Sequence, residues 1–391
     1  TDLTLNLSQN LSWTGGSFFL ETSAQRMDLF SEHKYSWQTS PIMIGYRQSL
    51  FGYNSLKWDR RIEPVRYQEA KKSYVETLEL VSANAINKFF ALATAQSDYD
   101  IASFNYANAN TLYRYAQGRY NIGTITENEM LQLELNCLTE ETNRMNARIE
   151  MDNCMQELRS YLGIQEDKEI RVRVSSRVPD FSINLNEALA LAYENSPDIQ
   201  TMKRRKLESE SAVARARANA GLKADIYLRF GLTQTADKLP EAYRNLLDQQ
   251  YVSLSISLPI LDWGRGKGQV RVARSNRDLV YTQVEQSRTD FELNVRKLVK
   301  QFNLQTQRVR IAARTDETAR RRNEVARKLY ILGKSTILDL NASISEKDSA
   351  RRNYVSALYN YWSLYYTLRS MTLYDFERNR LLTEDYNLLV E

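Results

Sequence analysis

The chain has 391 residues, of which only 13 are glycine and 6 are proline, so residues that break helices are scarce and long helices are expected. A single histidine and two cysteines nearly exclude multi-histidine metal sites, cysteine-rich zinc sites and a disulfide framework. The net charge of +5 comes from 53 basic and 48 acidic residues that are interleaved, so charge alone does not indicate a nucleic-acid partner.

Two stretches within the first 52 residues, at 3–8 and 42–47, alternate in the manner of a half-buried β-strand. The sequence Thr14-Gly15-Gly16 indicates a turn between them. We therefore expect a β-hairpin over about residues 3–52, in which residues 18–30 either continue the first strand or add another. The alternating apolar residues are Leu3, Leu5, Leu7, Ile42, Ile44 and Tyr46.

A long helix is expected next, because no glycine occurs between about residues 63 and 118. Pro64 is expected at its start, where proline is tolerated. At ~1.5 Å per residue this helix would be roughly 80 Å long. With a second helix it forms a predicted helical hairpin over about residues 60–163. Alanines recur every seven residues along it, which favours close coiled-coil packing; they are Ala95, Ala102, Ala109 and Ala116.

Two short glycine turns each end one long helix and begin another. Glycine at these points is typical of a left-handed helix C-cap, and Thr126 and Thr336 are expected N-caps. Glu129 is expected to complete a capping box with Thr126, and Asp339 occupies the same slot after Thr336. Capping alone would therefore account for both carboxylates. The turns are YNIGTIT at 120–126 and YILGKST at 330–336.

The middle of the chain reads as a linker followed by a helical pair. Residues 164–181 form the expected linker, and the alternation at 170–174 predicts a short strand within it. Residues 184–221 form an expected pair of helices. The sequence Ser196-Pro197 is the expected break between them, since proline disfavours a helical residue before it.

The remainder repeats the order of strands, long helix, turn and helix. The strict alternation at 252–258 is the strongest strand signal in the chain, and a second β-hairpin is expected at about residues 224–261. A second helical hairpin is expected at about 265–371, with its tip at 330–336. Residues 376–391 form the expected C-terminal tail.

An offset of 210 residues aligns the chain with itself, without a gap, from about residue 42 to about residue 163. This predicts an internally duplicated unit, with repeat 1 at 1–163 and repeat 2 at 182–375. The helical pair at 184–221 has no counterpart in repeat 1, so we expect that the chain is truncated at its N-terminus by at least one helical pair. The matched positions include Tyr120 and Tyr330, Gly123 and Gly333, Thr126 and Thr336, and Asn143 and Asn353.

Two hairpins supply four strands, which cannot close a barrel alone. Within a bilayer an open sheet would leave unsatisfied edge amides, so membrane strands of this kind require several copies of the chain. Three copies would supply twelve strands, with rows of leucine, isoleucine and valine facing lipid and serine, glycine and arginine facing water. The alternation alone is equally compatible with a sheet that packs on helices in a soluble protein.

The chain resembles the TolC-like outer membrane efflux proteins. The paired glycine turns carry the resemblance, together with residues 257–264 (SLPILDWG) and residues 185–197 (LNEALALAYENSP). Leu50-Phe51-Gly52 and residues 117–120 resemble the Bacteroidetes-type branch of the family. The resemblance covers nearly the whole chain.

The resemblance implies a mostly helical, mixed fold in a homotrimer. A twelve-stranded barrel would contact outer-membrane lipid, and a tunnel of coiled-coil hairpins would extend into the periplasm. The trimer would act as the passive outer-membrane duct of a tripartite efflux or type I secretion system, with an inner-membrane pump and a periplasmic adaptor protein. The turns would be the docking tips for the adaptor, with residues Tyr120, Asn121, Gly123, Thr124, Leu332, Gly333 and Lys334.

The resemblance also implies a gate at the periplasmic mouth. Glu129 and Asp339 would place six carboxylates around a narrow entrance in a trimer, which would favour cations. Tyr330 and Thr336 belong to the same expected gate. Ser335 stands where TolC itself has an arginine that locks the closed gate, so we expect the gate to be held by hydrogen bonds or by Lys334.

Other classes of function explain less of the sequence. A soluble coiled-coil scaffold explains the helices but not the strands with serine-lined faces. Nucleic-acid binding through the basic runs at 203–206 and 320–322 is disfavoured, because acidic residues interrupt them. No catalytic constellation, metal site or cofactor motif is found, and no run of 18 apolar residues predicts a transmembrane helix.

Overall fold

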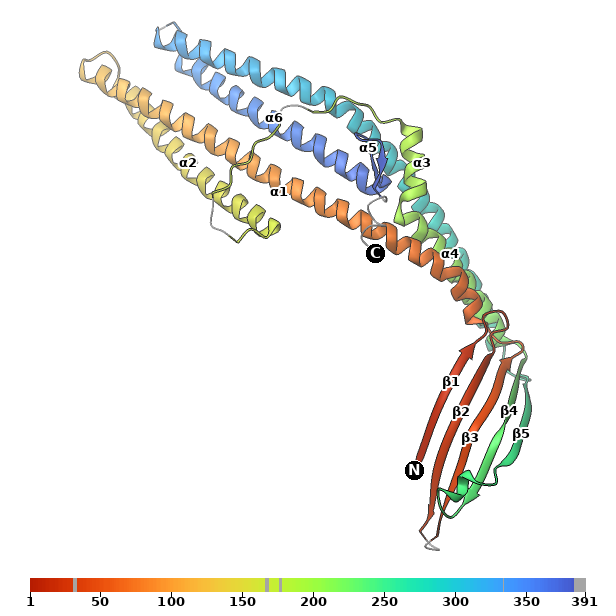
Figure 1. The fold of residues 1–391 in the computed structure, drawn as a ribbon. Coiled ribbons are helices and arrows are strands. Elements are labelled where there is room, and N and C mark those ends of the chain that lie inside the picture. Colours follow the sequence, from red (N-terminus) through yellow and green to blue (C-terminus); the bar gives the residue numbers. More distant parts are fainter. Residues whose placement is uncertain (31–33, 166–168, 176–177, 333, 383–391) are drawn as a thin grey trace. The chain divides into compact units, whose positions relative to one another are not determined.

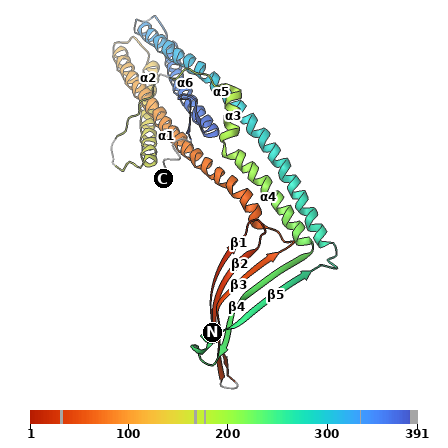
Figure 2. The same cartoon turned by 45° about the vertical axis from the view of Figure 1, so that its right-hand side comes forward.

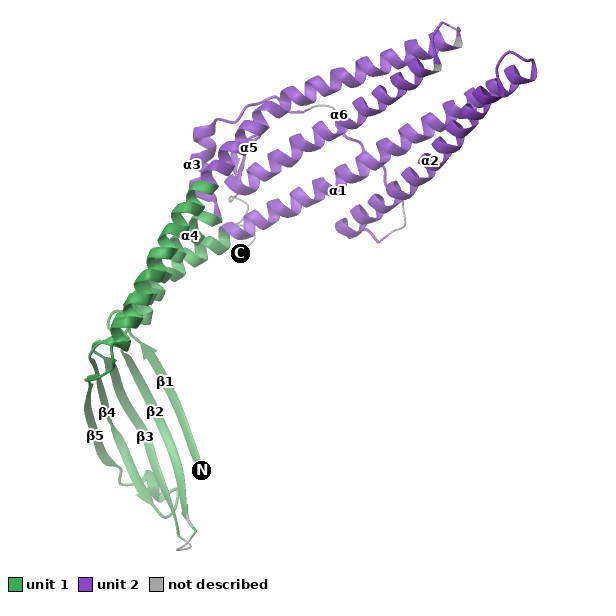
Figure 3. Ribbon diagram, turned by 180° about the vertical axis from the view of Figure 1, so that it is seen from behind, with its two compact units in different colours: residues 1–71, 197–290 green, residues 72–196, 291–391 purple. Residues whose placement is uncertain are grey.

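The computed structural model describes residues 1–30, 34–165, 169–175, 178–332 and 334–382 (Figure 1). The chain divides into two compact units, coloured separately in Figure 3. Unit 1 contains Thr1–Lys71 and Pro197–Asp290, and unit 2 contains Lys72–Ser196 and Phe291–Glu391. Two long helices, α1 (Ser55–Asn121) and α5 (Arg265–Ile331), contribute residues to both units.

Unit 1 contains a five-stranded sheet in which every neighbouring pair is antiparallel (Figures 1 and 2). The strand order follows the chain order, so the sheet is a simple meander. Its strands are β1 (Asp2–Asn10), β2 (Ser17–Leu29), β3 (Lys34–Ser49), β4 (Lys223–Ala236) and β5 (Leu247–Ser257). The short helix η1 (Glu241–Tyr243) lies between β4 and β5 and contacts β3 and β4.

The sheet has five strands rather than the four counted from the two predicted hairpins, because residues 17–29 form a strand of their own, which is the second of the two alternatives for residues 18–30. The chain reverses at Gly15, whose φ of +78° suits glycine, and the amide of Leu11 donates to the carbonyl of Gly16 at 2.8 Å. The returning strand β2 pairs with β1 on one side and with β3 on the other. Its alternation is obscured by a register shift between Glu21 and Ser23.

The helices of unit 1 are the first part of α1, the whole of α4 (Pro197–Ala220) and the first part of α5. Polar contacts join them. Tyr281 on α5 donates to Glu210 on α4 at 2.6 Å, and the hydroxyls of Tyr53 and Ser211 are 2.5 Å apart.

Helix α1 begins earlier than the sequence predicts. The side chain of Asn54 accepts a hydrogen bond from the amide of Lys57 at 2.9 Å and thereby caps the helix. Pro64 consequently lies inside α1 rather than in its first turn. A proline inside a helix removes one backbone hydrogen bond and destabilises it by about 3 kcal/mol, so packing has to hold this part of α1.

Unit 2 contains two helical hairpins. The rest of α1 pairs with α2 (Glu127–Leu162), and the rest of α5 pairs with α6 (Ile337–Thr372). The unit also contains α3 (Leu185–Asn195) and a small β-hairpin that was not predicted, formed by β6 (Tyr374–Asp375) and β7 (Arg380–Leu381). Residues 383–391 of the expected tail lie outside the described residues.

Aromatic and small residues form the core of unit 2. Phe302 on α5 packs against Tyr361 on α6, with ring centroids 5.1 Å apart, and Phe181 packs on Phe302 at 5.3 Å. In the first hairpin, Leu92 and Met151 are part of a buried cluster. The predicted alanine stripe is buried as well; its members are Ala95, Ala102, Ala109 and Ala116.

No strand forms at 170–174, although the sequence alternates there. The side chain of Gln96 on α1 makes the hydrogen bonds that a partner strand would otherwise make. Its amide nitrogen donates to the carbonyl of Ile170 and its oxygen accepts from the amide of Val172, both at 3.2 Å. Residues 166–168 and 176–177 of the linker lie outside the described residues.

The long helices of the two halves have equal lengths. Helices α1 and α5 each have 67 residues, and α2 and α6 each have 36. The first residues Ser55 and Arg265, like the last residues Asn121 and Ile331, are separated by the offset of 210 residues found in the sequence.

In the part of the chain that the structure describes, no helix combines the length and the apolar character needed to cross a membrane.

Candidate functional site

One face of the sheet in unit 1, here called the apolar face, exposes apolar side chains. Directly paired residues point to the same side of a sheet, so the register places Leu7, Leu20, Ile44 and Phe230 in one row across β1 to β4. Leu7 is 61% exposed and Phe230 is 45% exposed, which is unusual for such side chains. Other exposed residues of this face are Leu3, Leu5, Phe18, Ile42, Val252, Leu254 and Ile256.

The opposite face, here called the polar face, carries charged and small polar groups. Arg229 on β4 places its Nη2 3.9 Å from Oε1 of Glu21 on β2. The guanidinium of Arg47 lies 5.4 Å from the ring centroid of Tyr227, within the range of a cation–π contact. Further polar residues that the register places on this face are Asn6, Ser8, Ser17, Gln249, Ser253 and Ser255.

Gly45 on β3 makes the contact between Glu21 and Arg229 possible. It lies between Phe19 on β2 and Arg229 on β4 in a single cross-strand row. A Cβ atom at Gly45 would lie 2.0 Å from the ring of Phe19. The glycine therefore makes room for the aromatic ring and lets side chains of β2 and β4 meet across β3.

Exposed aromatic residues lie at both ends of the sheet. Trp13, in the turn from β1 to β2, and Trp263, between β5 and α5, are 80% and 89% exposed at the end near the helices. Phe30 and Tyr35 are exposed at the other end. Tyr46 instead packs on Phe18, with ring centroids 4.7 Å apart. Exposed aromatics at two levels are typical of the two lipid–water boundaries of a membrane strand.

The two outer strands each have one edge that pairs with no strand among the described residues. These are β1 and β5. A sheet with one oily face, one wet face and two free edges is suited to form part of a wall between lipid and water, and it needs further strands at both edges.

The first glycine turn, in unit 2, has the predicted caps. Gly123 has a φ of +73°, and the amide of Thr124 donates to the carbonyl of Arg119 at 2.9 Å. Thr126 and Glu129 form a complete capping box. Hydrogen bonds from the backbone and hydroxyl of Thr126 lower the pKa of Glu129, so the exposed carboxylate is charged at neutral pH. Tyr120 and Asn121 are exposed beside it.

The second turn has the same construction. Thr336 and Asp339 form a capping box, which the hydroxyl of Ser335 joins by donating to Asp339 at 3.3 Å. These hydrogen bonds lower the pKa of Asp339, and the one from the hydroxyl of Thr336 has the largest effect. Leu332 and Lys334 are exposed. Gly333 lies outside the described residues.

Tyr330 lies beside a small cavity of about 130 Å³ between the two hairpins of unit 2. Asn108 and Tyr115 on α1, Asn323 on α5 and Ile344 on α6 also line it. The structure therefore separates the expected gate residues: the carboxylates cap helices at the turns, whereas Tyr330 faces the space between the hairpins. Sequence reasoning did not identify Asn108 or Tyr115, because nothing local marks the side of α1 that faces α5.

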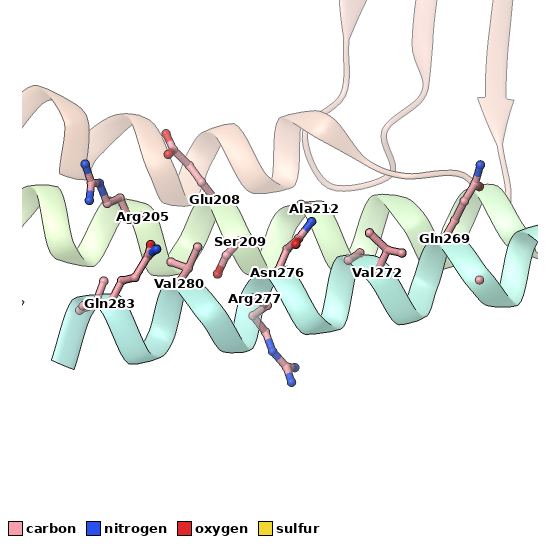
Figure 4. A pocket seen from close by; sticks show the side chains of 13 residues that line it. Arg205, Glu208, Ser209, Ala212, Gln269, Val272, Asn276, Arg277, Val280 and Gln283 are labelled. Carbon is pink, nitrogen blue, oxygen red and sulfur yellow. The ribbon is translucent and has the colours of Figure 1, made fainter. Parts of the chain in front are cut away.

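A groove of about 900 Å³ runs between α4 and α5 in unit 1 (Figure 4). Ala212, Val272 and Val280 give it an apolar lining, and Arg205 and Gln283 lie at one end of it. The residues that line it form no catalytic constellation. Among the described residues, no group of three or more histidine, cysteine, aspartate or glutamate side chains could hold a metal ion.

Two cations of the basic run at 203–206 are paired with acidic side chains. Arg204 Nε donates to Glu69 at 2.6 Å and Nη1 donates to Glu208 at 3.0 Å, while Lys206 pairs with Glu285 at 2.8 Å. The hydrogen bond from Arg204 holds the pKa of Glu69 below its usual value. Paired cations of this kind form a solvated helical surface and offer little to a phosphate backbone.

The model of a family described as outer membrane efflux protein matches residues 188–372. The fold is similar to that of the Campylobacter jejuni CmeC outer membrane channel, with 14% identity, 95% of this chain and 77% of that chain covered, and a TM-score of 0.71.

Two further outer-membrane proteins have similar folds. The outer membrane protein VceC from Vibrio cholerae is 13% identical, with 95% and 87% coverage and a TM-score of 0.68. The open state of the Neisseria gonorrhoeae MtrE outer membrane channel is 13% identical, with 95% and 80% coverage and the same TM-score. No curated protein matches the chain. These matches confirm the resemblance to TolC-like proteins and the mostly helical fold with antiparallel strands.

Proposed function

We propose, from the premise that residues 188–372 belong to the outer membrane efflux protein family, that this chain is a subunit of an outer-membrane efflux channel. The single observation that carries the proposal is the two-faced sheet. Its apolar face exposes leucine, isoleucine, valine and phenylalanine across five strands, and its polar face holds the Glu21–Arg229 ion pair. Lipid on one side and water on the other would satisfy both faces.

The free edges of the sheet support an assembly of several copies. A barrel has no edges, so copies of the chain would have to join β1 and β5 of neighbouring subunits directly or through further strands. We propose a homotrimer, as the family resemblance implies. The equal lengths of α1 and α5, and of α2 and α6, support an internally duplicated unit with two matched hairpins per subunit. Six such hairpins would form the wall of a periplasmic tunnel.

The glycine turns are the proposed docking tips for a periplasmic adaptor protein, which would connect the channel to an inner-membrane pump. Their exposed residues include Tyr120, Asn121 and Leu332. Glu129 and Asp339 are exposed and held ionised by their capping boxes. In a trimer they would supply six negative charges at the mouth, which favours cations. The chain would conduct its substrate passively and act as no enzyme.

The experiment that tests the proposal compares two neighbouring residues on the edge strand β5. Leu254 belongs to the apolar face and Ser255 to the polar face. Leu254→Arg should weaken insertion into lipid vesicles by about 2–4 kcal/mol, since arginine is costly at the lipid face of a barrel. Ser255→Arg, the matched control, should insert almost as well as the unmodified protein. Equal effects of the two substitutions would contradict a lipid-facing role for the apolar face.

A further inference from the structure

Strand β1 is a paired strand of the sheet in unit 1 and no loose terminal segment. It pairs with β2 over nine consecutive residues, from Asp2 with Gln25 to Asn10 with Ser17. Thr1 continues the ladder, because its carbonyl accepts from the amide of Arg26 at 2.7 Å. Leu3, Leu5 and Leu7 extend the apolar face onto β1.

The direction of β1 creates a closure problem for the proposed barrel. Four successive antiparallel pairs separate β1 from β5, so the two outer strands run in the same direction. Rotation about a barrel axis preserves strand direction. If β5 of one subunit paired with β1 of the next, every junction would be parallel, whereas single-chain outer-membrane barrels are antiparallel and have an even number of strands.

The duplicated hairpins identify β1 as the additional strand. Moved by 210 residues, β2 and β3 fall on β4 and β5, whereas β1 falls on residues 212–220, inside helix α4. In the second half, the chain passes from the end of α4 at Ala220 directly into β4 at Lys223. That connection enters the sheet at the end where the helices of unit 1 lie.

The start of β1 lies toward the opposite end of the sheet, where Asp2 pairs with Gln25, shortly before β2 ends at Leu29. The N-terminus is remote from α4 and from the first part of α1 in both views of the fold (Figures 1 and 2). Asn10, at the other end of β1, is near the helices, since Asn54 before α1 donates to the carbonyl of Ser12 at 3.2 Å. If a helical pair precedes this half, as the duplication leads us to expect, the connecting segment must cover most of the length of the sheet before it reaches Thr1.

We propose that this connecting segment, on the N-terminal side of Thr1, forms a sixth strand that runs antiparallel along the free edge of β1. This inference rests on the proposed barrel. With six strands, the outer strands of one subunit run in opposite directions, so every junction between subunits is antiparallel. Three copies of the five observed strands and the sixth would give a barrel of eighteen strands instead of twelve.

Electron cryomicroscopy of the full-length polypeptide, purified as an assembly in detergent, tests the proposal directly. Six strands per subunit, with a strand next to β1 that is contributed by residues before Thr1, is the expected result. Four strands per subunit with β1 detached, or five with parallel junctions, would overturn the sixth strand and leave the channel intact. An assembly with no barrel would overturn the proposed function and this inference together.

A crosslinking experiment tests separately whether β1 stays paired with β2 in the assembly. In a background with Cys137→Ser and Cys154→Ser, Leu5→Cys with Thr22→Cys would join β1 to β2, which the register places opposite each other. The control pair, Leu20→Cys with Ile44→Cys, joins β2 to β3. A short bifunctional thiol reagent should crosslink both pairs with equal yield, within one subunit of the conducting assembly. Crosslinking of the control pair alone would show that β1 leaves β2 and would overturn the proposal.

Discussion

Arg369 on α6 forms an ion pair with Glu79 on α1 and thereby ties the two helical hairpins of unit 2 together. Its Nη2 donates to Oε1 of Glu79 at 2.9 Å, and its Nε lies 2.9 Å from Oε2, an ionic contact without the alignment of a second hydrogen bond. Its Nη1 also reaches Asp375 at 3.4 Å. All three side chains are at most 15% exposed, so the charges depend on one another.

Arg369→Met should destabilise unit 2 by about 3–5 kcal/mol, because it leaves two buried carboxylates without a cation. The matched control is Arg352→Met. Arg352 pairs with Asp98 at 2.7 Å, but its side chain is 52% exposed, so that change should cost less than about 1 kcal/mol. The midpoints of urea unfolding measure both effects. Similar decreases of the urea midpoint in the two variants would contradict a larger contribution of the buried ion pair to stability.

Acid should weaken the same cluster. Burial alone would raise the pKa of Asp375, but hydrogen bonds from the hydroxyl of Tyr365 at 2.5 Å and from the amides of Arg378 and Glu377, with the charge of Arg369, hold it below its ordinary value of 3.8. A lowered pKa stabilises the fold above the unfolded value, and this stabilisation is lost as the pH falls through the folded value. Asp375→Asn should therefore be less stable than the unmodified protein at pH 7, and the difference in urea midpoint should shrink below pH 3.8. A constant difference at all pH values would contradict this.

The two turn carboxylates can be tested for charge separately from capping. Glutamine also serves at the third position of a capping box, so Glu129→Gln combined with Asp339→Asn should keep the helix starts but remove the charge. The reversal potential in asymmetric salt should move toward that of an unselective channel. Glu129→Ala with Asp339→Ala should show the same shift and also lose about 1 kcal/mol per cap. An unchanged reversal potential in both double variants would exclude these residues from the mouth of the pore.

Gly123 provides a test of the tip geometry. A Cβ atom there would meet nothing within 4 Å, but the φ of +73° would strain alanine by about 1–2 kcal/mol. Gly123→Ala should therefore distort the turn and lower the yield of crosslinking to the adaptor. Gly118→Ala, in the helical part of α1 and equally free of neighbours, should leave that yield unchanged. Equal yields from all three proteins would contradict docking at this turn.

The helix tips could be predicted from the sequence because their chemistry is local. Thr126 and Glu129 are three residues apart, as are Thr336 and Asp339, and both pairs form the expected capping boxes. The start of α1 was missed because Pro64 suggested a helix start, whereas the cap is supplied by Asn54.

Features that depend on distant partners could not be predicted. The alternation at 170–174 is that of a strand, but its hydrogen bonds go to the side chain of Gln96. The contact between Glu21 and Arg229 requires the register of three strands and a glycine between them. The division of residues 3–30 depends on the pairing of β2 with both neighbours, which alternation alone does not specify.

Single-channel conductance of the full-length polypeptide in a planar bilayer, measured together with its mass in detergent, decides between a channel and a scaffold. We expect a trimer that gives small, cation-selective currents. A monomer or dimer that gives no conductance would contradict a channel role for the two-faced sheet, and the coiled-coil scaffold would then be the better explanation of the helices.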